Sequence, residues 1–159
     1  MTNSNSYTVP GLSNDQGARV AALLQDRLNA YNDLHLTLKH IHWNVVGPNF
    51  ISVHEMLDPQ VETVRGFADE VAERIATLGS SAKGTPGTIV DGRSWDDYSI
   101  GRATAIEHLG ALDLVYAGVI GDTRKAIAEI GDIDPVTEDL LIGQSGQLEL
   151  FHWFVRAHL

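Results

Sequence analysis

The sequence predicts an all-α fold, a four-helix bundle with a long crossover between its second and third helices. Long stretches carry apolar residues at helical spacing, signals that start and stop helices stand at their ends, and no clear strand pattern occurs. With 159 residues and 43% hydrophobic content, the chain has the length of one domain and enough apolar residues for one core. We expect a single domain over residues 1–159 with a flexible N-terminal tail over residues 1–12.

The first helix is predicted to begin at a capping box, in which Ser13 is followed three residues later by Gln16. It is expected to run to about Val46, because apolar residues recur at every third or fourth position up to that point. These residues are Val20, Leu24, Leu28, Tyr31, Leu34, Leu38, Ile41 and Val45.

The second helix follows the turn Gly47-Pro48-Asn49, which breaks the helical pattern. A second capping box, Ser52 with Glu55, predicts where it starts, and Gly79 predicts that it ends at Leu78. A third helical pattern fills residues 100–130 and stops at Gly131. The fourth helix is predicted to begin at Asp134-Pro135 and to continue to the C-terminus, because Asp is a good N-cap and Pro suits the first helical position.

The segment between the second and third helices, residues 80–98, is rich in Gly, Ser, Thr and Pro. A helix of about 30 residues is about 45 Å long, and an extended segment of about 19 residues reaches about 60 Å. The segment is therefore long enough to return along the whole bundle, so that the third helix runs parallel to the second, as in ferritin-like bundles. A loose surface loop is the alternative that length alone leaves open.

The composition excludes several classes of function. The net charge of −10 argues against binding nucleic acid or membranes through overall charge, and it favours small cations as partners. Because the chain contains no cysteine, a metal ion would have to be held by nitrogen and oxygen ligands. No secretory leader or apolar run of membrane-spanning length is present, so a cytosolic setting is expected.

Two pairs of ligand-type residues stand four positions apart on the second helix, His54 with Asp58 and Asp69 with Glu73. Each pair projects from one face of the helix. The turn after the first helix brings His42 to the height of His54, so these two imidazoles and Asp58 can converge. Two imidazoles with three carboxylates suit iron, manganese, zinc or cobalt and leave coordination positions open.

The two pairs cannot bind one ion within a single chain, because their midpoints lie 15 residues apart, about 22 Å along a helix. An antiparallel two-fold dimer centred near residues 63 and 64 would set the first pair of one chain opposite the second pair of the other. As an alternative, Asp69 and Glu73 are solvated or paired with Arg65 or Arg74, and His54 only caps its helix.

The stretches KHIHWNVVGPNFISVHEMLDPQ and VRGFADEVAERIATLG, with the closing FHWFVRAHL, resemble the Dps proteins, mini-ferritins of the ferritin-like superfamily. The resemblance implies a hollow dodecamer with ferroxidase sites at its two-fold interfaces. His42, His54 and Asp58 would come from one subunit, and Asp69 and Glu73 from its neighbour. It further implies that hydrogen peroxide or oxygen oxidises Fe(II), that Fe(III) is stored as mineral, and that DNA and the cell are thereby protected. The expected location is the cytoplasm, with association with the nucleoid as an option.

The resemblance also assigns residues outside this set. Trp43 would lie near the site, where it packs the ligands or intercepts a stray oxidising equivalent, with a core aromatic as the alternative. Asp139 and Glu149 match the acidic pores that admit iron, and Zn²⁺ or Mn²⁺ could occupy the ferroxidase site. The family's DNA affinity often rests on basic tails, yet residues 1–18 contain no Lys or Arg and a dodecamer would carry 12 × (−10) = −120. We therefore expect DNA binding to be weak or absent.

Two other functions compete with the iron cage. A divalent ion in the same open site could act as a Lewis acid in a metal-dependent hydrolase. Alternatively, the bundle could be a structural, nucleoid-associated protein that only oligomerises. Unpaired carboxylates in a buried interface would be costly without a cation, which argues against the purely structural function.

Overall fold

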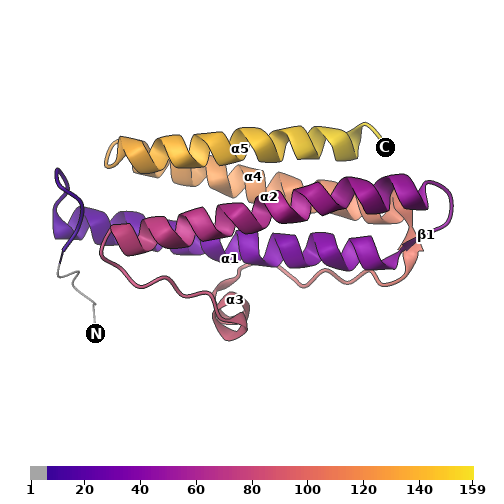
Figure 1. The fold of residues 1–159 in the computed structure, drawn as a ribbon, viewed down its shortest axis with the longest axis horizontal. Helices are drawn as coiled ribbons and strands as arrows, with labels where there is room; N and C mark the ends of the chain where they lie inside the picture. Colours follow the sequence, from indigo (N-terminus) through magenta and orange to yellow (C-terminus); the bar gives the residue numbers. More distant parts are fainter. Residues whose placement is uncertain (1–6) are drawn as a thin grey trace.

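The computed structural model describes residues 7–159 and confirms the all-α four-helix bundle (Figure 1). Two antiparallel hairpins build it, α1 with α2 and α4 with α5, and the segment between them carries the short helix α3. The helices are α1 (Asn14–Asn44), α2 (Phe50–Thr77), α3 (Pro86–Gly92), α4 (Ala105–Gly131) and α5 (Pro135–Arg156), and the two-residue strands are β1 (Val45–Val46) and β2 (Ala103–Thr104).

Helix α1 begins as predicted. The Ser13 hydroxyl accepts from the backbone N–H of Gln16 at 3.2 Å, and the Gln16 side chain accepts from the backbone N–H of Ser13 at 2.9 Å. The helix ends at Asn44, two residues before the predicted boundary, because Val45 turns to an extended conformation and enters β1.

The predicted start of α2 at a Ser52 capping box is wrong. The N-cap is Asn49, which has a φ of 66°, in the left-handed region that Asn tolerates better than most residues. Ser52 lies inside the first turn, and its hydroxyl donates to the backbone oxygen of Asn49 at 2.9 Å. The end of α2 is close to the prediction, since Leu78 is the C-cap and Gly79 leaves the helix with a φ of 87°.

Helix α4 starts at Ala105 and not at residue 100 as predicted, because the preceding residues run extended and pair with β1. Its N-cap is Thr104, which forms a capping box with Glu107. The pattern Thr-x-x-Glu was present in the sequence and marks this start. The prediction for α5 is confirmed, since the side chain of Asp134 caps the helix and Pro135 is its first residue.

The segment after α2 is a crossover and not a loose loop. It runs back along α1 to the other end of the bundle, so α4 runs parallel to α2 (Figure 1). It is tied to α1 by two hydrogen bonds between the Gln25 amide and the backbone of Lys83, and by the Trp95 indole N–H, which donates to Asp33 at 2.7 Å. At its end β2 pairs in parallel with β1, in the register Val45 to Ala103. Strands this short leave no periodic pattern in the sequence.

The core lies between the four long helices and contains every apolar residue predicted to line the inner face of α1. Of the tail predicted over residues 1–12, residues 1–6 lie outside the described residues, and Val9 and Leu12 pack partly buried against the core. The division into one domain with a flexible tail stays a prediction.

Candidate metal centre

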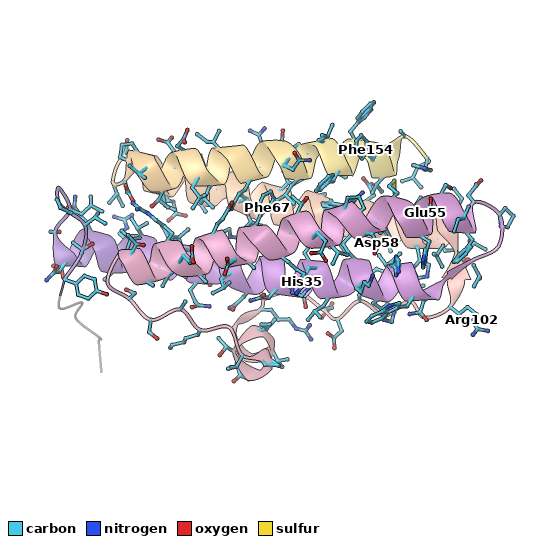
Figure 2. The ribbon with its side chains drawn as sticks, viewed as in Figure 1. His35, Glu55, Asp58, Phe67, Arg102 and Phe154 are labelled. Atoms are coloured by element: carbon cyan, nitrogen blue, oxygen red, sulfur yellow. The ribbon has the colours of Figure 1, made fainter. Side chains whose placement is uncertain are left out.

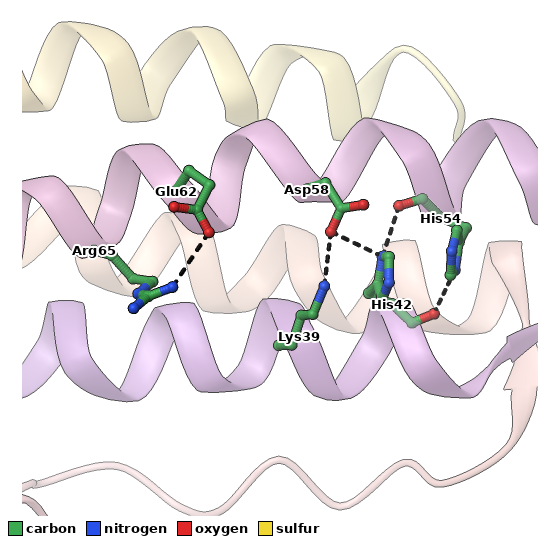
Figure 3. A network of polar contacts seen from close by, with 6 residues as sticks. All are labelled: Lys39, His42, His54, Asp58, Glu62 and Arg65. Atoms are coloured by element: carbon green, nitrogen blue, oxygen red, sulfur yellow. Dashed lines mark hydrogen bonds and ion pairs between the residues drawn. The ribbon is translucent and has the colours of Figure 1, made fainter.

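The turn between α1 and α2 brings two histidines together. His42 stands in the last turn of α1 and His54 in the second turn of α2. Their rings stack with centroids 3.6 Å apart and an interplanar angle of 22°. Figure 3 shows the two rings side by side between the helices, with Asp58 one turn further along α2.

The two imidazoles hold each other's tautomer through the backbone. Nδ1 of His42 lies 2.8 Å from the backbone oxygen of His54, and Nδ1 of His54 lies 2.8 Å from the backbone oxygen of His42. Because a carbonyl oxygen only accepts, each Nδ1 carries the proton, and each Nε2 keeps a lone pair. Among residues 7–159, no hydrogen bond engages either Nε2. Two oriented nitrogen donors are therefore available to a metal ion.

Asp58 completes this group on the same side of the hairpin. Its Oδ1 lies 3.4 Å from Nδ1 of His42 and 2.8 Å from Nζ of Lys39 (Figure 3). The hydrogen bond from Lys39 is the main cause that lowers the pKa of Asp58, with smaller contributions from the two histidines. The sequence interpretation missed Lys39, although its position three residues before His42 places it on the same helical face.

The second pair, Asp69 and Glu73, is exposed on α2, and neither forms an ion pair with another described residue. Of the alternative, the pairing with Arg65 or Arg74 is wrong, whereas the solvent exposure of both carboxylates within one chain is confirmed. Arg65 pairs with Glu62 at 3.3 Å, and Arg74 donates to Asp134, the N-cap of α5, at 2.8 Å.

One chain therefore presents two separate half-sites. Helix α2 is continuous over both pairs, so their midpoints lie about 22 Å apart. Within residues 7–159 no three or more His, Asp or Glu side chains converge on a position that could hold a metal ion. In Figure 2, Asp58 lies toward the end of α2 that joins α1, while His35 lies further along the bundle. His35 and Asp69 line the same shallow cavity against α1, together with Arg65.

Trp43 is not a core aromatic, because 69% of the residue is exposed. It follows His42 directly in the chain, at the end of α1.

The residues predicted to line a pore are not brought together within one chain. Asp139 and Glu149 stand ten residues apart on α5, about 15 Å along the helix. Asp139 is exposed, whereas Glu149 is held by Arg124 at 2.6 Å and by the Ser145 hydroxyl at 3.2 Å. Their role at a pore stays a prediction.

The sequence Glu-x-x-His at the end of α5 does not form a metal site within the chain. Nε2 of His152 lies 2.5 Å from Oδ1 of Asp113 on α4, and Arg156 donates to the same oxygen at 2.8 Å. The partner of His152 is therefore a carboxylate of α4 and not Glu149.

Comparison with known proteins identifies the family. A model of the ferritin-like domain matches residues 21–159. The DNA protection during starvation protein of Mycolicibacterium smegmatis is 68% identical over 154 residues, which cover 97% of this chain and 84% of the relative. The chain belongs to the Dps family of ferritin-like proteins.

Solved Dps structures have the same fold. Mycobacterium smegmatis Dps superposes with a TM-score of 0.96 and 68% identity, covering 97% of this chain and 93% of that one. DpsA14 from Streptomyces coelicolor superposes with a TM-score of 0.97 and 65% identity, covering 98% and 93%. The fine tangled pili major subunit of Haemophilus ducreyi is also similar, with 50% identity over 159 residues, all of this chain and 84% of the relative.

Within residues 7–159 of this Dps-family chain, no helix combines the length and apolar character needed to cross a bilayer.

Proposed function

We propose that this Dps-family protein is a ferroxidase that oxidises Fe(II) with hydrogen peroxide, or with oxygen, and stores the Fe(III) as mineral inside a dodecameric cage. One observation carries the proposal. His42 and His54 present two oriented nitrogen lone pairs, Asp58 lies 3.4 Å from the His42 ring, and an unpaired carboxylate pair stands about 22 Å away on the same helix. A half-site that one chain cannot complete requires a second copy.

The completed site would form where α2 of one subunit packs antiparallel against α2 of its neighbour, about a two-fold axis near residues 63 and 64. His42, His54 and Asp58 of one subunit would then face Asp69 and Glu73 of the other. Fe(II) is the substrate here. Two imidazoles and three carboxylates bind it through nitrogen and oxygen and leave positions for the oxidant.

The electron balance of the reaction needs two Fe(II) ions for each peroxide. Each iron loses one electron, and hydrogen peroxide accepts two electrons and two protons while its O–O bond breaks, which gives two waters. The carboxylates offset the positive charge that iron gains, and the backbone bonds at Nδ1 keep the two imidazoles in place during the change. Trp43, exposed beside the site, would pack against the neighbour or intercept a stray oxidising equivalent.

The same proposal covers the assembly and its setting. The acidic surface would attract Fe(II), and carboxylates at pores, Asp139 above all, would guide it inward. Glu149 contributes less to that field, because Arg124 neutralises it. Zn²⁺ or Mn²⁺ would compete for the ferroxidase site. Consuming Fe(II) and peroxide together in the cytoplasm would protect DNA and the cell from oxidative damage.

The test is the anaerobic oxidation of Fe(II) by hydrogen peroxide, measured on the assembled protein after its size has been determined. The same measurement is made on a His42→Ala, His54→Ala double variant. We expect rapid oxidation and soluble iron in the wild-type protein, and loss of the fast phase in a variant that keeps its size. His158→Ala, at an exposed histidine after α5, is the matched control and should keep the wild-type rate. Equal rates in the double variant would show that the half-site is not the oxidation centre.

A further inference from the structure

A hydrogen-bonded pair of aromatic side chains, Tyr98 and His108, joins the end of the crossover to α4. The phenolic oxygen of Tyr98 lies 2.8 Å from Nδ1 of His108, and the two rings stack with centroids 6.0 Å apart and an interplanar angle of 12°. His108 is fully buried, and Tyr98 is half-buried beside it. Neither residue belongs to the half-site of His42, His54 and Asp58, so the candidate metal centre does not account for the pair.

The surroundings of His108 leave its Nδ1 free to accept a proton. Burial is the main cause that lowers the pKa of His108, so the imidazole is uncharged at neutral pH. The buried Nε2 forms no regular hydrogen bond within residues 7–159, but the backbone of Asn44 and of Gly101 is close enough to oppose this shift. Backbone carbonyl oxygens act in this way when they face the N–H group of a ring. The N–H group is therefore at Nε2, and the phenol of Tyr98 donates to the lone pair of Nδ1.

This base sets Tyr98 apart from the other tyrosines of the chain, which number four in all. Tyr116 donates to the side-chain oxygen of Gln60 at 2.6 Å. The hydroxyls of Tyr7 and Tyr31 have no imidazole as partner within residues 7–159. A phenol that loses an electron also loses its proton, so its oxidation is faster where a base stands within hydrogen-bond reach. Tyr98 is therefore the tyrosine best placed to be oxidised.

The pair lies near the end of α1 that carries the half-site. The ring of Tyr98 packs edge-on against His40 with centroids 5.7 Å apart, and Nε2 of His40 lies 2.8 Å from the backbone oxygen of Ile100. His40 stands two residues before His42 on α1, about 3 Å along the axis. The His40 ring contacts the crossover, whereas the His42 ring contacts α2, so about one helix width, roughly 10 Å, separates them. An electron tunnels over such a distance, whereas a proton needs a base in contact.

We propose that Tyr98 is a redox-active residue that takes up oxidising equivalents which escape from the iron site, with His108 as the base for its proton. The inference rests on the proposed ferroxidase function, because that function supplies Fe(II) and hydrogen peroxide. A single Fe(II) that meets peroxide loses one electron, the O–O bond breaks, and hydroxide and a hydroxyl radical form. The radical takes one electron from a side chain at the site, such as the indole of Trp43, and becomes a second hydroxide.

An electron from Tyr98 would then restore the indole of Trp43, while the phenolic proton moves to Nδ1 of His108. The products are Fe(III), two hydroxide ions, a neutral tyrosyl radical at Tyr98 and a protonated His108. The iron and the tyrosine each give up one electron, and peroxide accepts both. The oxidising equivalent would thus come to rest inside the protein, under the crossover, and not on a molecule outside it.

Electron paramagnetic resonance on the assembled protein tests the proposal. Samples with less than one Fe(II) ion for each site and an excess of hydrogen peroxide are frozen during the reaction. We expect a tyrosyl radical in the wild-type protein and its loss in Tyr98→Phe, while that variant still oxidises Fe(II) at the wild-type rate. Tyr7→Phe, at an exposed tyrosine without an imidazole partner, is the matched control and should keep the radical.

Oxidation without iron tests the role of the base. A ruthenium(III) polypyridyl complex, generated by a laser flash, serves as the one-electron oxidant, in a Tyr7→Phe background so that the exposed tyrosine does not contribute. His108→Gln should slow the formation of the tyrosyl radical about a hundredfold, as the loss of a general base does. Electron–nuclear double resonance on the wild-type radical should show one exchangeable proton hydrogen-bonded to the phenolic oxygen, which is the proton held at Nδ1.

Three results would overturn the proposal. They are a tyrosyl radical of wild-type size in Tyr98→Phe, no such radical in a wild-type assembly that oxidises Fe(II), and an unchanged flash rate in His108→Gln. No oxidation of Fe(II) by the wild-type protein would refute the ferroxidase function instead, and the flash experiment would still decide whether Tyr98 is redox-active. Should His108→Gln fail to assemble, the absence of an exchangeable proton at the wild-type radical would refute the role of His108.

Discussion

At the scale of single residues, contacts with the backbone keep the two imidazoles of the half-site in order. The two histidines are fixed by backbone oxygens and need no ion for their orientation. Asp58 is different, because its carboxylate is engaged by Lys39 at 2.8 Å. Both Lys39 and His42 approach Oδ1 of Asp58, so a divalent cation that binds this oxygen competes with the ammonium group of Lys39.

Replacing Lys39 by Met should therefore strengthen metal binding. Because 51% of the Asp58 side chain is exposed, the effect should be small, about fivefold at most at low salt, in line with exposed ion pairs. Titration of the sized assembly with Co²⁺, which binds without being oxidised by the protein, measures it. Lys125→Met, which removes a similar exposed pair on α4, is the control. Weaker Co²⁺ binding in Lys39→Met would mean that the lysine supports the site.

Lys39→Met should also change the pKa of Asp58. With the hydrogen bond from Lys39 gone, the pKa of Asp58 should rise toward the ordinary value for aspartate, because the lysine is the main cause that lowers it. Carboxyl NMR of the metal-free protein would follow this change. An unchanged pKa would show that the two histidines, and not the lysine, set the charge of Asp58.

The sequence could predict His42, His54 and Asp58 as a group because a turn and helical spacing fix their heights. It could not predict that Lys39 occupies Asp58, since a flexible lysine has several carboxylates within reach and only packing selects one. The same holds for Arg27, which is buried and whose guanidinium contacts Val119 and Thr123 of α4.

At the scale of elements, periodicity predicted the four long helices, and local signals predicted the ends that local chemistry controls. The Ser13 cap of α1 and the Asp134 cap of α5 are such ends. The starts of α2 and α4 depend instead on the Gly-Pro-Asn turn and on pairing between β1 and β2, and these were misplaced by a few residues. The first is a local turn with Asn49 in the left-handed region, whereas the second is a contact between distant segments.

Asp134 joins α5 to α2 and should make the stability of the bundle depend on pH. Burial would raise its pKa, but hydrogen bonds from Thr137 and Arg74 outweigh burial and lower it. With a folded-state pKa below the ordinary value of about 3.9, its contribution is fully present above that value and is lost as the pH falls further.

Asp134→Asn should destabilise the protein by about 2 kcal/mol at neutral pH, because the largely buried Arg74 loses its charged partner while the cap is kept. The difference from wild type should shrink near pH 3, which thermal unfolding at the two pH values would show. Asp132→Asn, at an exposed position in the same turn, should leave the free energy of unfolding nearly unchanged. A deficit that persists unchanged at pH 3 would assign the loss to packing and not to charge.

At the scale of the whole molecule, charge sets which partners the assembly can approach. A cage of twelve such chains would carry 12 × (−10) = −120 at neutral pH, which repels phosphates and attracts divalent cations. We predict no shift of plasmid DNA in gels at about 150 mM salt and at most a faint one at low salt. A retained shift at moderate salt would show that a local basic surface overrides the net charge.

The proposed sharing of each site between two subunits makes the last prediction quantitative. We consider one variant with His54→Ala and Asp58→Ala and a second with Asp69→Ala and Glu73→Ala. Each alone should be inactive in peroxide-driven oxidation of Fe(II), because every site lacks one half. If the two are mixed, dissociated and reassembled at random, half of the two-fold dimers are hybrids, and each hybrid has one intact site and one that lacks both halves.

About a quarter of all sites should then be intact, and the mixture should recover about a quarter of the wild-type rate. Mixing without dissociation is the control and should recover nothing. A site built within one chain predicts no recovery in either case, because no subunit of the mixture has both halves. Recovery would thus establish the antiparallel pairing of α2 that the separation of about 22 Å between the two ligand pairs demands.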